Sequence, residues 1–245
     1  MSYALKSYPK IDSVENFAQF LNERGRAFLK ELEPDYAQKY DDCLSKKLPS
    51  KKIHEICDPL LTGRLNKLTG VMEALYEVRY SWKRLTEVAR LLGTVSPSTF
   101  PEQMDDSQWF VYNLDFYWQA YSGLFEHLVT LLTRLDQCFK LDEIDRKRLE
   151  VYARATRETR DGVQKIRGQL AHMKTEGAGG IRSDHEWEAS LLSNDRSDFV
   201  ETYDERMAHD KDFYLNYILK WVGETRQAIN TVFTDLCGFE LRELR

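Results

Sequence analysis

Apolar residues recur at three- and four-residue spacing along most of the chain, which is the period of an α-helix. A first helix is expected over residues 13–33, because its apolar positions repeat every turn. Asp12 and Glu15 fit a capping box at its start. Pro34 ends that run or begins a short helix, and Pro49 marks another break.

Long helical patterns continue through the rest of the chain. The last of them is expected to break near His209. The segment 94–106 contains two prolines and little periodicity, and 175–198 is polar and contains several glycines, so both are predicted to be loops. The expected long helices span residues 58–92, 107–139, 142–174 and 199–236.

The pattern over residues 107–139 is apolar around most of the helix, with aromatic residues such as Trp109, Tyr117 and Tyr121. Such a helix is central or packed on two sides. Aromatic side chains also stack on nucleic-acid bases. The helical spacing favours a core or a subunit interface instead.

Composition supports helices over strands. The chain has only 12 glycines and 6 prolines in 245 residues, fewer than a protein rich in turns requires. Hydrophobic residues make up 42%, enough to bury a core. We therefore expect an all-α fold, a bundle of long antiparallel helices. An N-terminal helical region (1–94) and a helical bundle (107–236) are expected to pack as one unit.

The chain has no run of about 18 apolar residues, the length needed to span a membrane. The segment after Met1 lacks the apolar stretch of a secretory signal. The four cysteines form no Cys-x-x-Cys pair and are expected to be reduced. These features predict a cytoplasmic protein without a membrane partner.

Charge is distributed unevenly along the chain. The net charge is −5, yet residues 146–175 hold nine Lys or Arg and three acids, so this segment carries 9 − 3 = +6. On an ideal helix, one narrow face is predicted to meet the core, formed by Tyr152, Ala155, Thr159, Val163, Ile166, Leu170 and Met173. The remaining surface is then cationic. It either pairs with acidic parts of the fold or binds an anion such as nucleic acid.

Several cations of this segment are candidates for phosphate contacts: Arg154, Arg157, Arg160, Lys165 and Lys174. Near its end, the sequence Arg167-Gly168-Gln169-Leu170-Ala171-His172 places an arginine five positions before a histidine. An arginine can hold a phosphate, and a histidine can move a proton near neutral pH. Because the two lie about 140° apart on an ideal helix, they meet on one small ligand only through local unwinding or in a dimer.

This motif resembles the R-x4-6-H signature of the HEPN superfamily of small helical bundles, with Ala171 fitting the position before the histidine. Active members commonly carry Asn, Asp or His after the arginine, whereas this chain has Gly168. The resemblance implies an RNA-binding module or a metal-independent endoribonuclease that works as a homodimer. It implies Arg167 and His172 as catalytic residues, with no cofactor.

Two other functions are open. A non-catalytic helical module could act through protein contacts or dimerisation, with its basic helix balanced by acidic neighbours; the sequence identifies no protein partner. A metal-carrying bundle is the third possibility, through Glu205 with His209 or through the cluster at 184–186. The E-x-x-H signature of di-iron bundles is missing, so no metal site is predicted.

Overall fold

The computed structural model describes residues 11–57, 59, 63–94, 106–175, 198–241 and 243–244. Within its helices, only the backbone is described at residues 29, 32, 54, 64–65, 93–94, 106–112, 166–175 and 198–214.

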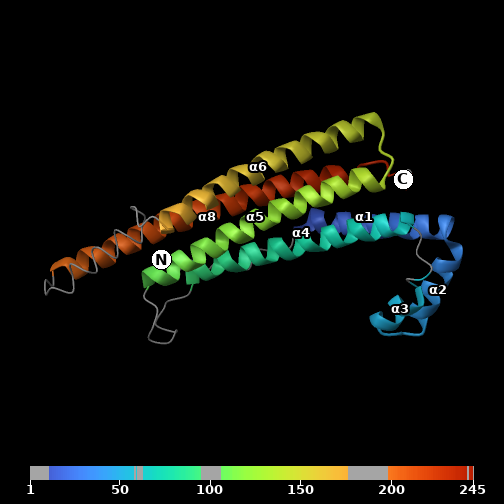
Figure 1. The fold of residues 1–245 in the computed structure, drawn as a ribbon, viewed down its shortest axis with the longest axis horizontal. Helices are drawn as coiled ribbons and strands as arrows, with labels where there is room; N and C mark the ends of the chain where they lie inside the picture. The colour runs from blue at the N-terminus through green and yellow to red at the C-terminus, as the bar shows by residue number, and fades with distance from the viewer. Residues whose placement is uncertain are drawn as a thin grey trace. The chain divides into compact units, whose positions relative to one another are not determined.

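The described chain is helical almost throughout, which confirms the predicted all-α bundle (Figure 1). It contains no named β-strand, and one isolated bridge pairs Phe139 with Leu244. The helices are α1 (Asp12–Leu32), α2 (Pro34–Ser45), α3 (Ser50–Cys57), α4 (Gly63–Thr94), α5 (Asp106–Cys138), α6 (Glu143–Thr175) and α8 (Asp198–Leu236).

The long helices match their predicted ranges closely, and two details differ. Helix α3 was not predicted, because its eight residues give too few apolar positions to show a period. Helix α8 is continuous from Asp198 to Leu236, so the expected break near His209 is wrong. Most of each predicted loop, at 94–106 and at 175–198, lies outside the described residues. The residues at their edges, 94, 106, 175 and 198, are already helical.

The chain divides into two compact units, and both draw on distant parts of the sequence. Unit 1 comprises Met1–Pro9, Tyr80–Phe125 and Glu158–Gln227, and unit 2 comprises Lys10–Arg79, Glu126–Arg157 and Ala228–Arg245. Each unit therefore contains residues from both predicted ranges, 1–94 and 107–236. That division of the chain stays a prediction.

Unit 2 is built around α1, α4, α5 and the end of α8. Helices α1 and α4 run antiparallel, because Glu15 pairs with Arg79 at 2.7 Å and Gly25 lies against Leu68 further along. The rings of Phe17 and Phe233 meet edge to face, 5.4 Å apart. Leucines from α1, α4 and α5 complete the core. Burying each such side chain contributes about 1.5–3 kcal/mol. The fully buried side chains of the unit 2 core include Phe17, Leu21, Leu75, Leu131, Leu132, Phe139 and Phe233.

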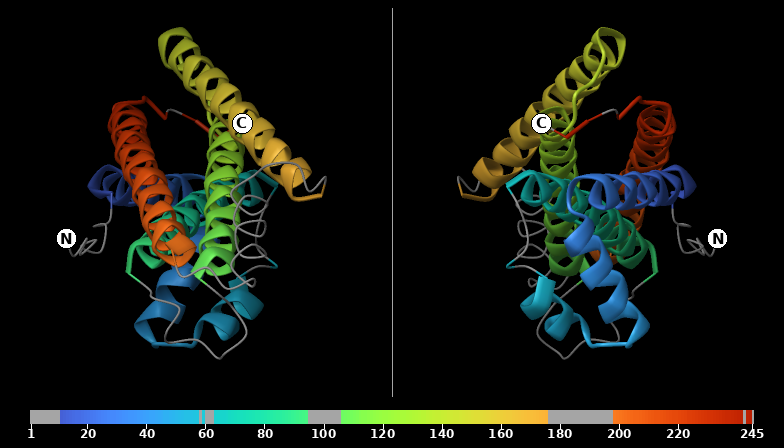
Figure 2. Two further views of the ribbon diagram at one scale, coloured as in Figure 1. Left: turned by 90° about the vertical axis from the view of Figure 1, so that its left-hand side faces the viewer. Right: turned by 90° about the vertical axis from the view of Figure 1, so that its right-hand side faces the viewer.

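The short helices α2 and α3 add a small cluster to unit 2. Helix α2 packs against α1, and α3 packs against α2 (Figure 2). Cys43, Ile53 and Cys57 are buried between them, and the rings of Tyr36 and Tyr40 stack beside this cluster. All four cysteines of the chain are free thiols, as predicted.

A C-terminal segment fastens α5 to α6 within unit 2. The Lys140 backbone N–H donates to the Glu243 carbonyl at 2.9 Å, and their side chains form an ion pair. The buried Asp145 carboxylate accepts the backbone N–H of Glu240 at 2.9 Å. Tyr152 of α6 donates a hydrogen bond to Asp235 of α8. These contacts orient the N-terminal part of α6.

Unit 1 has an aromatic core contributed by α5 and α8. The rings of Trp118 and Trp221 meet 5.0 Å apart, and the Tyr121 and Thr225 hydroxyls hydrogen-bond at 2.8 Å. The two helices therefore run in the same direction in this unit. Tyr117, Trp118 and Tyr121 are buried, so the core interpretation of this aromatic helix is confirmed for them. The Trp109 side chain lies outside the described residues.

Candidate cationic surface and polar cleft

Helix α6 begins with acids and becomes basic afterwards. Asp142 caps its first turn, because its Oδ1 accepts the backbone N–H of Asp145 at 2.8 Å. Glu143 and Asp145 occupy the first turn, where negative charge suits the positive end of the helix dipole. The cap thus fixes where the helix starts, and the cations follow from Arg146 onward.

The buried side of α6 agrees with the predicted side only in part. Ala155 and Thr159, which the periodicity places toward the core, are exposed. Val163 of the predicted face is buried in unit 1, as expected. In unit 2 the buried side chains are instead Leu149 and Ala153, so the inward side there is rotated by about 70° from the predicted one on an ideal helix. Alanine and threonine gain little from burial, so the larger Leu149 decides which side packs.

Two predicted phosphate-binding residues stand exposed in unit 2. Arg154 and Arg157 are both exposed, and neither has an ion-pair partner among the residues that the structure describes. Glu150 lies one turn before Arg154, but the two side chains form no ion pair in the described structure. Lys165, in unit 1, is also exposed. These cations are available to an anionic ligand.

Other cations of α6 are bound to carboxylates. Arg160 is half-buried, with 29% of its side chain exposed, and its guanidinium meets Asp161 at 2.7 Å. Lys147 pairs with Glu143 at 2.7 Å. Arg160 is therefore partly buried and already paired. To bind a phosphate, its guanidinium would first have to break its contact with Asp161.

The predicted catalytic pair is carried by the last turns of α6. The backbone of Arg167, His172 and Lys174 is helical, and their side chains lie outside the described residues. On a continuous helix, the two motif positions are about 140° apart. The local unwinding near Gly168 that would bring them together is not seen in the backbone of α6.

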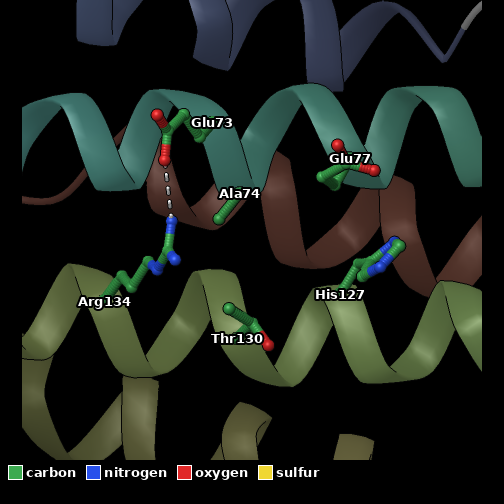
Figure 3. A pocket seen from close by; sticks show the side chains of 6 residues that line it. All are labelled: Glu73, Ala74, Glu77, His127, Thr130 and Arg134. Atoms are coloured by element: carbon green, nitrogen blue, oxygen red, sulfur yellow. Dashed lines mark ion pairs between the residues drawn. The ribbon is translucent and has the colours of Figure 1, made fainter.

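A second polar site is a cleft between α4 and α5 in unit 2, with a volume of about 460 Å³ (Figure 3). His127 extends from α5 and Glu77 from α4 into one end of it, and Glu73 and Arg134 meet at the other. The lining residues are Glu73, Ala74, Glu77, His127, Thr130 and Arg134.

The arginine of this cleft contacts both the backbone and an acid of α4. Arg134 Nη1 donates a hydrogen bond to the Gly70 carbonyl and lies 3.5 Å from a Glu73 carboxylate oxygen. The Thr130 hydroxyl donates to the Glu126 carbonyl at 2.9 Å, as in an ordinary helix. A carboxylate and an imidazole can exchange protons. The cleft presents no positioned nucleophile beside them among the described residues, so we assign it no chemistry.

Burial raises the pKa of several groups near these sites. Burial and the hydrogen bond to Asp235 raise the pKa of Tyr152 to about 12, so this phenol stays a proton donor at neutral pH. Burial raises the pKa of the Cys138 thiol to about 11. Cys138 is therefore protonated and unreactive near neutral pH, as a core thiol should be.

No group of three or more metal-ligating side chains is found among the described residues. The Glu205 and His209 side chains and residues 184–186 lie outside them. Sequence reasoning did not anticipate the α4–α5 cleft. A signal for it exists: His127, Thr130 and Arg134 are spaced at three and four residues on one side of an otherwise apolar helix.

No helix in the described part of the chain combines the length and the hydropathy needed to cross a bilayer. Comparison of the chain with models of known protein families, with curated proteins and with solved structures gave no match.

Proposed function

We propose that this chain binds single-stranded RNA through the exposed arginines of α6. The observation that supports the proposal most is the state of Arg154 and Arg157, which are exposed and without an ion-pair partner among the described residues. They lie in a segment of charge +6 within a chain of charge −5. A local concentration of cations attracts a polyanion even where the whole protein repels it.

Arginine suits this role for geometric reasons. Its planar guanidinium donates two parallel hydrogen bonds to a phosphate and keeps its charge at every physiological pH. Arg154 and Arg157 are three residues apart, so their side chains lie on neighbouring parts of the helix surface. Their rise along the helix axis is about 4.5 Å. One flexible strand can therefore contact both arginines through successive phosphates.

The binding test uses a fluorescently labelled single-stranded RNA of 20 nucleotides and measures anisotropy at low salt. The double variant Arg154→Gln/Arg157→Gln should bind about tenfold or more weakly, because each lost phosphate contact removes part of a dominant electrostatic term. The matched control is Arg24→Gln/Arg26→Gln, which removes two exposed arginines from α1. Equal weakening by both variants would show a response to net charge alone and contradict the proposal.

We further propose that Arg167 and His172 cleave the bound RNA, as the resemblance to the HEPN superfamily implies. The 2′-hydroxyl beside a phosphate would attack phosphorus as His172 removes its proton. The bond to the 5′-oxygen breaks, and that oxygen takes a proton. A 2′,3′-cyclic phosphate and a 5′-hydroxyl result. Arg167 would stabilise the charge that builds on the phosphate oxygens.

The cleavage test incubates the protein with mixed RNAs in EDTA, which removes metal-dependent nucleases. The expected result is cleavage by the natural protein, none by His172→Ala, and none of a substrate with a 2′-deoxynucleotide at the cut site. Intact RNA in every reaction would refute cleavage and leave the binding proposal untouched. Cleavage that survives in His172→Ala would assign it to another group.

A homodimer is part of this proposal. Arg167 and His172 are about 140° apart on one continuous helix, so a single α6 presents them to different sides. Two copies related by a two-fold axis can supply the arginine of one and the histidine of the other to the same phosphodiester. Mixing Arg167→Ala and His172→Ala proteins should then restore part of the activity. Lack of any restored activity would contradict the shared site.

A further inference from the structure

The turn that joins α2 to α3 in unit 2 (Figure 2) carries four lysines and no acid. Residues 43–54 contain no Asp or Glu, so this segment has a charge of +4 with histidine counted as neutral. All four lysines are exposed, and none forms an ion pair with a residue that the structure describes. They are Lys46, Lys47, Lys51 and Lys52, and together they are called the lysine turn.

Backbone hydrogen bonds hold the lysine turn in one conformation. Two N–H groups of the turn donate to carbonyls in the last turn of α2 and close the end of that helix. These bonds run from Lys47 to Leu44 at 2.9 Å and from Leu48 to Cys43 at 3.2 Å. The Pro49 carbonyl then accepts the Lys52 N–H at 2.9 Å, at the start of α3. The lysines are therefore carried by an ordered backbone, so binding does not have to order the chain first.

Local structure does not explain why three of the four residues are lysine. Lys46 and Lys47 follow the negative end of the α2 dipole, which suits a cation. Lys47, however, has a φ of 51°, a conformation that glycine adopts more readily than any residue with a side chain. Lys51 and Lys52 lie in the first turn of α3, where the positive end of the dipole disfavours cations. Unfavourable local choices of this kind are found where a residue serves binding.

We propose that the lysine turn is a second contact for single-stranded RNA, on a different element from the arginines of α6. The inference rests on the proposed function, because it assigns the same ligand. Four cations without an acid among them attract successive phosphates. The ammonium group of lysine acts as a point charge on a flexible stem, so it can follow the variable spacing of phosphates in a single strand.

The lysine turn would contact the RNA backbone and leave the bases unread. Residues 43–54 contain no Phe, Trp or Tyr on which a base could stack. Phosphate contacts carry no sequence information. A phosphate bound there would also offset the repulsion among the four ammonium groups. We therefore expect this contact to raise affinity and salt dependence equally for RNAs of different sequence.

An anionic membrane fits the lysine turn less well. Lysines are attracted to anionic lipids, but helices that lie on a membrane also bury apolar side chains in it. Within the turn, the large apolar side chain is Leu48, which packs against the buried cluster of α2 and α3. Leu44 and Ile56 are 43% and 38% exposed, so the fold covers more than half of each. The exposed charge of the turn is thus suited to phosphates without a lipid interior.

The test measures the anisotropy of the labelled RNA over a series of salt concentrations. Lys51→Gln/Lys52→Gln should weaken binding at low salt by about fivefold and reduce the salt slope by about 0.7 for each lysine that contacts a phosphate. The matched control Arg24→Gln/Arg26→Gln removes the same charge from α1 and should keep the natural slope. Removing cations from the positive end of α3 should not unfold the chain, which circular dichroism checks.

Lys47→Gly separates binding from folding. Glycine adopts the backbone conformation of residue 47 without strain, so the urea midpoint of unfolding should not fall. RNA affinity should nevertheless drop by about twofold, because one phosphate contact is lost. Natural RNA affinity in this variant would count against the proposal.

An unchanged affinity and slope in Lys51→Gln/Lys52→Gln, or equal losses in this variant and the α1 control, would overturn the inference. If the α6 double variant still weakens binding, the proposed function stands without the lysine turn. If only the lysine variants weaken binding, the lysine turn stands and the α6 site fails. No RNA binding by any of the proteins would refute both. Phosphatidylserine vesicles that bind the natural chain but not Lys51→Gln/Lys52→Gln, with RNA binding unchanged, would assign the turn to a membrane.

Discussion

Arginines occur both on the outer surface of α6 and in the α4–α5 cleft, but they differ in the contacts that they make. In the cleft, Arg134 bonds to the Gly70 carbonyl and lies 3.5 Å from a Glu73 carboxylate oxygen. On α6, Arg154 and Arg157 have no ion-pair partner among the described residues. Arg134 therefore links α5 to α4, whereas Arg154 and Arg157 form no ion pair with any other described element.

The difference shows that the placement of acids, more than the number of cations, decides what an arginine does. A half-buried guanidinium needs a partner, because leaving it unpaired costs free energy. An exposed guanidinium is hydrated and screened by salt, so the fold tolerates it without one. We therefore expect Arg134 to contribute to the stability of the fold, and Arg154 and Arg157 to contribute to RNA binding.

The largest expected effect, on the free energy of unfolding, comes from reversing the charge of Arg134. Arg134→Glu would place a third carboxylate beside Glu73 and Glu77 and remove the bond to Gly70. The free energy of unfolding should fall by about 1–2 kcal/mol, because the Arg134 and Glu73 side chains are 40% and 68% exposed and solvent screens their charges. Urea denaturation measures this. RNA affinity should not change by more than about twofold. A large loss of RNA binding by the folded variant would place the RNA site in the cleft and break the comparison.

Tyr152 tests the inward side of α6. Tyr152→Phe removes the hydrogen bond to Asp235 and should lower the free energy of unfolding by about 1 kcal/mol at neutral pH. In the folded protein the pKa of Tyr152 is raised to about 12, above its usual value of about 10. The stabilisation is therefore complete below pH 10 and disappears as the pH rises toward 12.

Unfolding curves of the natural protein and Tyr152→Phe should accordingly converge over that pH interval. A difference that stays constant from pH 8 to pH 12 would show that the phenol proton contributes nothing. The phenol absorbance of Tyr152, obtained by subtracting the spectrum of the variant, gives its titration directly.

A smaller effect is expected from removing an acid near the exposed arginines. Glu150 lies one turn before Arg154, so its negative charge would repel a phosphate that approaches this arginine. Glu150→Gln should raise RNA affinity by about two- to threefold, equivalent to about 0.5 kcal/mol. Glu73→Gln in the cleft is the matched control and should leave the affinity unchanged. Weaker RNA binding by Glu150→Gln would mean that this carboxylate supports the site.

The smallest expected effect on stability comes from removing Lys147, a cation that is paired but exposed. Lys147 contacts Glu143 one turn away at 2.7 Å, with 72% of the lysine side chain exposed. Such pairs contribute about 0.3–0.5 kcal/mol, so Lys147→Gln should be close to neutral in stability. A loss above about 1 kcal/mol would show that exposed pairs on α6 are as important as the pair in the cleft.

The helices could be predicted from the sequence because helical periodicity is a local property. α1, α5 and α6 begin and end within a few residues of their expected bounds. The short α3 left no such period. The inward side of α6 was predicted in part: Val163 is buried as expected. Ala155 and Thr159 are exposed because they gain little from burial, and Leu149 and Ala153 pack instead.

The candidate sites could be predicted only in part. The cationic segment follows from residue identities along one helix, so the exposed Arg154 and Arg157 were anticipated. Arg160 was expected on the outer surface, but its side chain is only 29% exposed and its guanidinium is paired with the neighbouring Asp161. The cleft depends on contacts across 64 residues, such as Arg134 with Gly70, and no local pattern fixes such pairings.

The most direct test of the account is the salt dependence of RNA binding. The logarithm of the association constant should fall linearly with the logarithm of salt concentration, and Arg154→Gln/Arg157→Gln should reduce that slope by about 0.7 for each arginine that contacts a phosphate. The variant Arg24→Gln/Arg26→Gln should keep the natural slope. Identical slopes for all three proteins would contradict an RNA site on α6.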